Sequence, residues 1–221
     1  MVSTQYKKLL IWGADGHCKV LEEFIDQLGY KLVSVFDNDT TKLSPFPEIP
    51  IYFGYEGLKA WLEENNNDSY YSLVAIGGTN GKVRVEILEY LSSKAIAPIV
   101  VIHPTAFVAR SAIIGEGCQV LANSSVSVNV KMGVSCIINT SASVDHECEL
   151  GDGVHVAPGA ILDGCVTVDN YSFIGSGAVV LPRIHVGKNV IVGAGSIVTK
   201  DIPDGKVVYG NPAKIIRDNT Q

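Results

Sequence analysis

From residue 108 to residue 198, an aliphatic side chain recurs at every sixth position. The members of this series are Val108, Ile114, Val120, Val126, Met132, Ile138, Val144, Leu150, Val156, Leu162, Val168, Ile174, Val180, Val186, Val192 and Val198. Four residues after each of the first fifteen comes a small or aliphatic residue, such as Ala112, Cys118 or Ser124. A period of six fits neither an α-helix nor an isolated strand. It is typical of a parallel β-helix, in which short strands wrap a triangular prism and three repeats close one coil.

The residue directly after each aliphatic position is Gly, Asn or Asp in ten of the sixteen cases, for example Gly115, Gly133, Asn139 and Gly151. These residue types tolerate positive φ better than others. We therefore expect this position to turn the corner between strands. Eighteen residues per coil then give about five coils in this stretch.

The first hundred residues show a different pattern, in which strands and helices alternate. The predicted strands cover residues 8–12, 32–36, 73–76 and 99–102, and the predicted helices cover residues 16–28, 55–64 and 80–91. This order predicts a parallel sheet. We expect a small Rossmann-like α/β domain over residues 1–102 and a β-helix domain with a C-terminal cap over residues 103–221. The predicted fold class is therefore mainly β.

Two predicted strands end in segments that can bind a nucleotide. The first ends in Gly13-Ala14-Asp15-Gly16-His17, and the second ends in Asp37-Asn38-Asp39. Glycines at a strand-to-helix turn let backbone amides approach a phosphate, and an acid after the second strand can accept hydrogen bonds from a ribose or a base. Plain turn geometry explains both segments equally well.

Composition excludes several classes of protein. The chain has 221 residues, of which 47% are hydrophobic and 18% are charged, as is ordinary for a globular protein. A net charge of -6 argues against a nucleic-acid-binding surface. The apolar run from Ala95 to Ile102 is too short to span a membrane, and the run from Leu9 to Trp12 is too brief for a signal peptide. We expect a cytoplasmic protein without a membrane span.

The cysteines of the repeat region favour packing over chemistry. Cys118, Cys136 and Cys148 occupy the small inward position, whereas Cys165 does not. No Cys-x-x-Cys pair occurs. We expect buried packing residues rather than disulfides, and no metal site.

Three motifs, combined with this organisation, resemble one bacterial family. The motifs are the Gly-x-x-Gly-His turn, the stretch Asn-Thr-Ser-Ala-Ser-Val-Asp-His-Glu-Cys at residues 139–148, and Gly-Asn-Pro-Ala-Lys at residues 210–214. The family is that of the sugar O- and N-acyltransferases. It includes sialic acid O-acetyltransferases and N-acetyltransferases of nucleotide-linked 4-amino sugars. The likeness spans residues 8–217. It implies a left-handed coil, although crossovers between parallel strands are normally right-handed, and a homotrimer with active sites between subunits.

The resemblance implies that His146 is a general base and that the carboxylate of Glu147 strengthens it. A sugar amine that attacks a thioester must lose a proton, and an imidazole is suited to accept it near neutral pH. A nearby carboxylate stabilises the imidazolium. The alternative for a histidine at a corner is a solvated surface residue.

The resemblance also implies that acetyl-CoA is the acyl donor and that His155, Ser176 and Ala194 contact it. Nine residues separate His146 from His155, which is half a coil, so the two side chains should lie on different sides of one subunit. A site that uses both would draw them from neighbouring chains. For Ser176 and Ala194, filling a tight backbone is an equally good explanation.

The residues that the resemblance assigns to the nucleotide-linked sugar are Asp15, Gly16, His17, Asp37, Asn38 and Gly77. Asp15 departs from the family, which often has a small residue there, and a carboxylate beside a diphosphate is unfavourable unless it turns away. His17 could instead cap the helix that it begins.

The implied function is acetyl-CoA-dependent N-acetylation of the 4-amino group of a UDP- or GDP-linked amino sugar, in bacterial surface glycan biosynthesis. The alternative is O-acetylation of sialic acid or a related sugar. A zinc carbonic anhydrase is disfavoured because the five histidines lie 86, 43, 9 and 30 residues apart and lack that group's close pair. A non-catalytic scaffold would have no use for a His-Glu pair.

Overall fold

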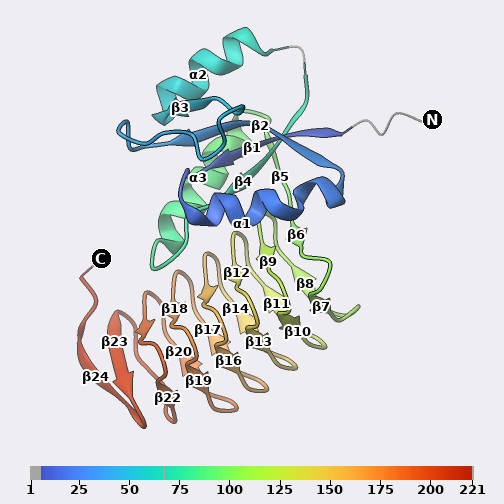
Figure 1. Cartoon of the computed structure of the whole chain (residues 1–221). Helices are drawn as coiled ribbons and strands as arrows, with labels where there is room; N and C mark the ends of the chain where they lie inside the picture. The colour runs from blue at the N-terminus through green and yellow to red at the C-terminus, as the bar shows by residue number, and fades with distance from the viewer. Residues whose placement is uncertain (1–5, 67, 221) are drawn as a thin grey trace. The chain divides into compact units, whose positions relative to one another are not determined.

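The structure is a computed structural model that describes residues 6–66 and 68–220. The chain divides into two compact units, the first comprising Met1–Ile76 and Glu86–Ile99 and the second comprising Gly77–Val85 and Val100–Gln221 (Figure 1). Residues 77–85 belong to the second unit because they pack against the repeats. Among the described residues, no helix is both long enough and apolar enough to cross a membrane.

A five-stranded parallel sheet forms the centre of the first unit. Its strands, in spatial order, are β3 (Ile51–Phe53), β2 (Tyr30–Asp37), β1 (Lys7–Trp12), β4 (Tyr70–Val74) and β5 (Ala97–Pro98). The helices in chain order are α1 (Gly16–Ile25), the 3-10 helix η1 (Asp26–Leu28), α2 (Gly54–Glu64) and α3 (Gly81–Ser93). The first turn of α3 lies in the second unit.

The buried pattern explains why these elements form. Strand β1 buries Leu9 through Trp12 without alternation, as expected for a central parallel strand with both faces covered. Helix α1 buries Cys18, Leu21 and Ile25, which lie three and four residues apart on one face. Gly29, with φ of 81°, ends η1 in the left-handed conformation. The predicted helix over residues 16–28 is thus confirmed as α1 followed by η1.

Three sheets, in which all strands but β24 are parallel, form the β-helix. The first, in spatial order, is β22 (Ile197–Val198), β19 (Val179–Val180), β16 (Ile161–Leu162), β13 (Ser143–Val144), β10 (Ser125–Val126) and β7 (Phe107–Val108). The second is β20 (His185–Val186), β17 (Thr167–Val168), β14 (Glu149–Leu150), β11 (Lys131–Met132) and β8 (Ile113–Ile114). The third is β24 (Ala213–Asp218), β23 (Lys206–Gly210), β21 (Ile191–Val192), β18 (Phe173–Ile174), β15 (His155–Val156), β12 (Ile137–Ile138), β9 (Gln119–Val120) and β6 (Val101–Ile102).

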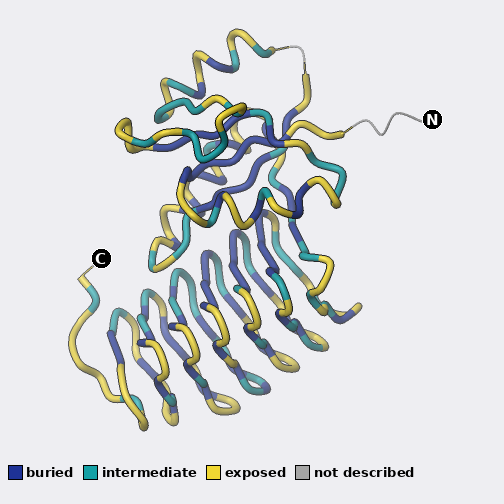
Figure 2. The backbone as a smooth tube through the Cα atoms, viewed as in Figure 1, coloured by how far each residue is buried: buried dark blue, intermediate teal, exposed yellow. Residues whose placement is uncertain are grey.

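Each coil takes eighteen residues, because Val126 pairs with Val144 and Val144 pairs with Leu162. The aliphatic series points inward as predicted. Its members from Val120 to Val198 are buried, and Val108 and Ile114 at the open end are half-buried. The small partners from Cys118 to Ser196 are buried as well. Figure 2 shows this as alternating buried and exposed segments along every coil.

The predicted corner position is wrong. The left-handed residue is the third after each aliphatic from Ile114 to Val192, as in Asn123, Glu147 and Cys165. The glycines directly after the aliphatics serve a close approach between coils instead. A Cβ on Gly115 would lie 2.4 Å from the carbonyl oxygen of Gly133, and one on Gly175 would lie 2.6 Å from the amide nitrogen of Ala194. Glycine is therefore needed at these positions because there is no room for a side chain, and not because of φ.

A hairpin closes the end of the β-helix. Strand β23 runs parallel to β21 and extends the third sheet, and β24 pairs with β23 in the antiparallel sense. The hairpin thereby covers the edge of the last coil, which an open solenoid would leave exposed.

Candidate functional site

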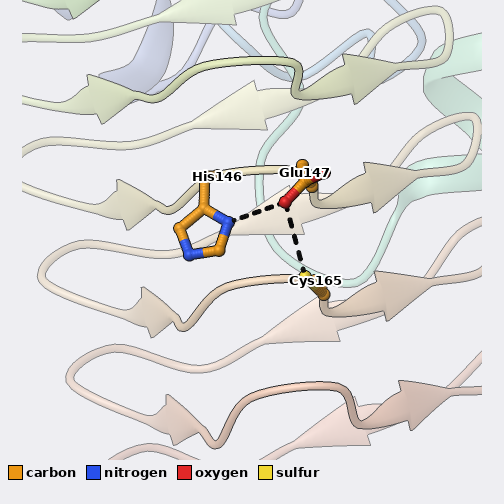
Figure 3. Close-up of side chains that lie close together, drawn as sticks. All are labelled: His146, Glu147 and Cys165. Carbon is orange, nitrogen blue, oxygen red and sulfur yellow. Dashed lines mark hydrogen bonds and ion pairs between the residues drawn. The ribbon is translucent and has the colours of Figure 1, made fainter.

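His146 and Glu147 lie on one corner of the β-helix, between β13 and β14. The Nδ1 atom of His146 is 3.1 Å from Oε2 of Glu147 (Figure 3). The two side chains are 48% and 59% exposed, so both are open to a ligand. Glu147 has a φ of 58°, the left-handed conformation that recurs at this corner. With Nδ1 held by the carboxylate, Nε2 is the nitrogen that can accept a proton.

Gly164 makes room for the His146 ring. A Cβ at residue 164 would lie 2.5 Å from Nε2 and 2.6 Å from Cε1 of His146. Gly164 follows Leu162 by two residues, one coil beyond the corner that carries His146. The imidazole therefore rests against the bare backbone of the next coil. Gly164 was not singled out from the sequence. It lies eighteen residues, or one coil, after His146, and this spacing indicates that the two residues are neighbours.

Cys165, which was expected to be a buried packing residue, also lies at this corner. It lies eighteen residues after Glu147, at the same corner of the next coil, and its Sγ is 3.8 Å from Oε2 of Glu147 (Figure 3). It also has a left-handed φ, of 62°. Cys18, Cys118, Cys136 and Cys148 are buried, whereas Cys165 is partly exposed. The prediction of buried packing residues is thus confirmed for the inward cysteines and does not hold for Cys165.

His155 lies on a different side of the β-helix from His146, as predicted, in β15 of the third sheet. It is 4% exposed. Its Nδ1 is 3.2 Å from the carbonyl oxygen of Gly78, and its Nε2 is 3.1 Å from Nδ2 of Asn139. This pattern fits the tautomer that carries its proton on Nδ1, which donates to the carbonyl and leaves Nε2 to accept from the amide. A Cβ on Gly77 would lie 3.8 Å from Cε1 of His155, so the structure brings these two predicted residues together.

Arg84 fastens the segment of residues 77–85 to the coils. Its side chain is fully buried, and it donates hydrogen bonds to the carbonyl oxygens of Ser135 at 3.1 Å and Gly153 at 2.7 Å. Burial lowers the pKa of its guanidinium to about 10. Gly81 also lies close to the repeats, since a Cβ there would meet the carbonyl oxygen of Gly153 at 2.3 Å. These contacts set the place of Gly77 and Gly78 beside His155.

Ser176 and Ala194 occupy the same corner of adjacent coils, after β18 and β21 of the third sheet. Both are exposed. The amide of Gly195 donates to the carbonyl oxygen of Ser176 at 2.9 Å, which keeps the two corners in register. They follow strands of the sheet that contains His155, so the three residues predicted to contact acetyl-CoA share one side of the prism.

The glycine turn after β1 leads directly into the N-terminus of α1. Gly13 has a φ of 113°, and a Cβ there would lie 2.6 Å from the carbonyl oxygen of Ala75. Gly16 begins α1, and a Cβ on it would meet nothing within 4 Å. Gly13 is therefore required by the fold. Gly16 opens on free space at a helix N-terminus, where backbone amides attract anions.

The carboxylate of Asp37 forms the turn, which is the alternative that the sequence left open. It accepts hydrogen bonds from the amides of Ala14 at 2.8 Å and Asp39 at 2.9 Å. Lys42 reaches both Asp37, at 3.1 Å, and Asp15, at 2.7 Å. These contacts, above all that with Asp15, raise the pKa of Lys42 and keep it charged. Lys42 was not identified from the sequence, because no motif marks it.

The other predicted sugar ligands lie around this turn. Asn38 is exposed directly after Asp37, and His17 is half-buried in the first turn of α1. The residue at the helix N-cap is Asp15, and its side chain makes no capping hydrogen bond. The carboxylate of Asp15 is paired with Lys42 instead, which offsets the repulsion expected between Asp15 and a diphosphate.

Comparison with known proteins identifies relatives of both units. Residues 8–91 match the family model described as the PglD N-terminal domain. A GDP-perosamine N-acetyltransferase from Caulobacter crescentus, solved in complex with CoA and GDP-perosamine as a variant with one histidine replaced by alanine, is 33% identical. The match covers 96% of this chain and 97% of that one, with a TM-score of 0.87.

Two further solved structures are similar from end to end. The acetyltransferase domain of PglB from Neisseria gonorrhoeae, in complex with acetyl coenzyme A, is 35% identical over 96% of this chain and 100% of that one, with a TM-score of 0.84. WeeI from Acinetobacter baumannii is 25% identical over 95% and 100% of the two chains, with a TM-score of 0.81.

Proposed function

The chain belongs to the family of left-handed β-helix sugar N-acetyltransferases, and from this premise we propose that it acetylates a nucleotide-linked amino sugar. The acetyl group comes from acetyl-CoA, and the acceptor is the 4-amino group of a UDP- or GDP-linked sugar used for bacterial surface glycans. The observation that carries the proposal is the exposed His146–Glu147 pair above Gly164. It occurs in a chain that is similar over its whole length to an enzyme solved with CoA and GDP-perosamine.

His146 is the general base of the proposed reaction. As the sugar amine attacks the thioester carbonyl, a C–N bond forms and Nε2 of His146 takes the amine proton. The tetrahedral intermediate then collapses, the C–S bond breaks, and CoA leaves as a thiol after it takes up a proton. Glu147, 3.1 Å from Nδ1, fixes the ring and stabilises the imidazolium that forms. The protein needs no covalent nucleophile and no metal for this transfer.

The two ligands have separate sets of residues. For the nucleotide-linked sugar we assign the turn of Asp15, Gly16 and His17 together with Asp37 and Asn38, and Gly77 beside His155. Open space at Gly16 and the charged Lys42 support the assignment of an anionic ligand to the turn. For acetyl-CoA we assign His155, Ser176 and Ala194. The exposed, closely spaced backbone of the last two suits an extended pantetheine arm.

A homotrimer with active sites between subunits completes the proposal. Support comes from the placement of His146 and His155 on different sides of one prism. A site that uses both histidines would therefore take one from each of two neighbouring chains. We place the reaction in the cytoplasm, where acetyl-CoA and nucleotide sugars are available. The five free cysteines fit a reducing compartment.

The experiment that tests the proposal is a free-thiol release assay with acetyl-CoA. The acceptors are a panel of UDP- and GDP-linked 4-amino sugars, with free and CMP-linked sialic acid for comparison. We expect turnover on at least one amino sugar, and a loss of about a hundredfold or more in His146→Ala. His185→Ala is the matched control, because it removes an exposed histidine that also pairs with a carboxylate. If only sialic acid is turned over, the proposed N-acetylation is wrong and the enzyme is an O-acetyltransferase.

A further inference from the structure

His146, Glu147 and Cys165 bring three different metal-binding atoms to one exposed corner. One imidazole nitrogen, a carboxylate oxygen and the thiol Sγ all lie within 4.8 Å of one another (Figure 3). The Nδ1–Oε2 distance is 3.1 Å and the Sγ–Oε2 distance is 3.8 Å. Glu147 and Cys165 are held by the same corner geometry in successive coils, with φ of 58° and 62°. The cluster therefore belongs to the rigid repeat and not to a loose loop.

These distances match the ligand set of a tetrahedral zinc ion. Zinc binds imidazole nitrogen and carboxylate oxygen at about 2.0–2.2 Å and thiolate sulfur at about 2.3 Å, so its ligand atoms are about 3.4–3.6 Å apart. The Nδ1–Oε2 separation of 3.1 Å and the Sγ–Oε2 separation of 3.8 Å bracket this range. Three protein ligands leave the fourth position open for water. Softer sulfur and nitrogen donors favour Zn²⁺ over Mg²⁺ or Ca²⁺.

The other cysteines do not compete for such an ion. Cys18, Cys118, Cys136 and Cys148 are all buried, so their thiols lie in the interior and away from an ion at the exposed corner. Cys165 is the partly exposed thiol of the chain.

We propose that His146, Glu147 and Cys165 form a binding site for a thiophilic divalent cation such as Zn²⁺, and that the bound ion inhibits the enzyme. Binding releases the proton of the Cys165 thiol to solvent, because the thiolate is the ligand. The inhibition by the bound ion rests on the proposed function. With the ion on Nδ1, the proton of the neutral imidazole is on Nε2. The ring then offers a hydrogen-bond donor where the reaction needs a base, and acetyl transfer stops.

The first test measures binding without reference to activity. The full chain, stripped with EDTA, is titrated with Co²⁺, and the thiolate-to-cobalt charge-transfer absorption is followed before displacement by Zn²⁺. We expect saturation at one Co²⁺ per chain and loss of the thiolate band in Cys165→Ser. His185→Ala, which removes the exposed histidine paired with Asp169, should leave the band unchanged. An absent thiolate band in the folded wild type, or an equal band in Cys165→Ser, would overturn the proposal.

The second test measures inhibition by Zn²⁺ in the acetyl-transfer assay. Wild-type activity should fall with Zn²⁺ and return with EDTA. In Cys165→Ser, with inhibition expressed relative to the rate of that variant without Zn²⁺, the Zn²⁺ concentration for half inhibition should rise at least about tenfold. Equal inhibition of both proteins would refute the inhibitory role. If no sugar is turned over but the thiolate band appears, the proposed function fails and the metal site stands. If a sugar is turned over but the band is absent, the proposed function stands and the metal site fails.

Discussion

The ring of His146 has its place because residue 164 carries no side chain. The backbone of Gly164 faces Nε2 and Cε1 of the imidazole, and a Cβ would come within 2.6 Å of both. The φ of Gly164 is not in the left-handed region, so an alanine is compatible with the backbone there. Space for the His146 ring, and not turn geometry, explains the glycine.

Gly164→Ala should therefore impair the base without unfolding the coil. The Cβ displaces the imidazole by about an ångström, and a misplacement of that size in a catalytic group costs about 10- to 100-fold in kcat. The thermal midpoint should change little. Steady-state kinetics of Gly164→Ala, His146→Ala and the double variant provide the check. Once His146 is absent, adding Gly164→Ala should have no further effect. Additive losses would show that Gly164 acts elsewhere.

The family resemblance pointed to His146 and Glu147 because they are adjacent residues within one motif. Gly164 and Cys165 are neighbours of these residues only through the coil, and finding them requires the period of eighteen to be applied to function as well as to packing. Asp37 was predicted with two possible roles; its hydrogen bonds with the amides of Ala14 and Asp39 show the turn-forming one, and its contact with the sugar stays a prediction. Lys42 was missed because a lysine five residues after an acid has no distinctive pattern.

At the scale of elements, the turn from β1 into α1 separates two kinds of glycine. Gly13 combines a left-handed φ with close contact to the carbonyl oxygen of Ala75, whereas Gly16 has neither constraint. Gly13, which the fold requires, and Gly16, which faces open space, thus lie three positions apart.

We expect Gly16→Ala to fold normally and to raise the KM for the nucleotide sugar at least about tenfold, a loss of about 1.4 kcal/mol in binding. The reason is that its methyl group occupies the space over the helix N-terminus that a phosphate would enter. Gly13→Ala should instead destabilise the first unit by about 2 kcal/mol. Urea unfolding and substrate titration separate the two effects. An unchanged KM in Gly16→Ala would remove this turn from the proposed binding site.

Arg84 holds a helix turn against the coils. Replacing it by alanine leaves the carbonyl oxygens of Ser135 and Gly153 without these donors in a buried place. Each unsatisfied buried group costs about 1–3 kcal/mol, so Arg84→Ala should lower the free energy of unfolding by about 2 kcal/mol or more. Lys82→Ala, at an exposed position of the same turn, is the control. Equal unfolding midpoints for the two variants in urea would contradict this role.

The main elements of both units were predictable because each carries a period or a strong apolar run. Strand β3 (Ile51–Phe53) was not predicted, since it is a three-residue edge strand that follows Pro47 and Pro50. The corner position was misplaced for a different reason. The same residue type, glycine, serves close packing at one position of the repeat and positive φ at another, and composition alone does not distinguish them.

On the scale of the whole molecule, the outward residues of the β-helix differ between sheets. In the first sheet they include Phe107, Ile161 and Val179 and no charged side chain, and Phe107 and Ile161 are 60% and 39% exposed. The outward residues of the second sheet include the ion pair of Lys131 and Glu149. Ser125 and Ser143 complete this uncharged row between Phe107 and Ile161. An uncharged row with several apolar side chains suits a surface that is buried between subunits.

Ile161→Asp should therefore break the proposed trimer, because it places a carboxylate in an apolar contact. The matched control is Ile113→Asp, which changes an isoleucine of the same outward class in the second sheet that is 63% exposed. Sedimentation analysis should give three times 23.6 kDa for the wild type and the control, and a smaller mass for Ile161→Asp. A wild-type monomer with full activity would contradict active sites shared between chains.

Direct transfer of an acetyl group to a sugar nitrogen forms an amide bond, and this bond can be identified in the product. Acetyl-CoA labelled with ¹³C at the carbonyl is incubated with a GDP- or UDP-linked 4-amino sugar, and the product is examined by NMR. We expect a labelled amide carbon coupled to the N4 proton. The wild type should form this product, and it should be nearly absent with His146→Ala. A labelled ester on a sugar oxygen, or an acetyl group retained on the protein, would contradict direct transfer to the sugar nitrogen.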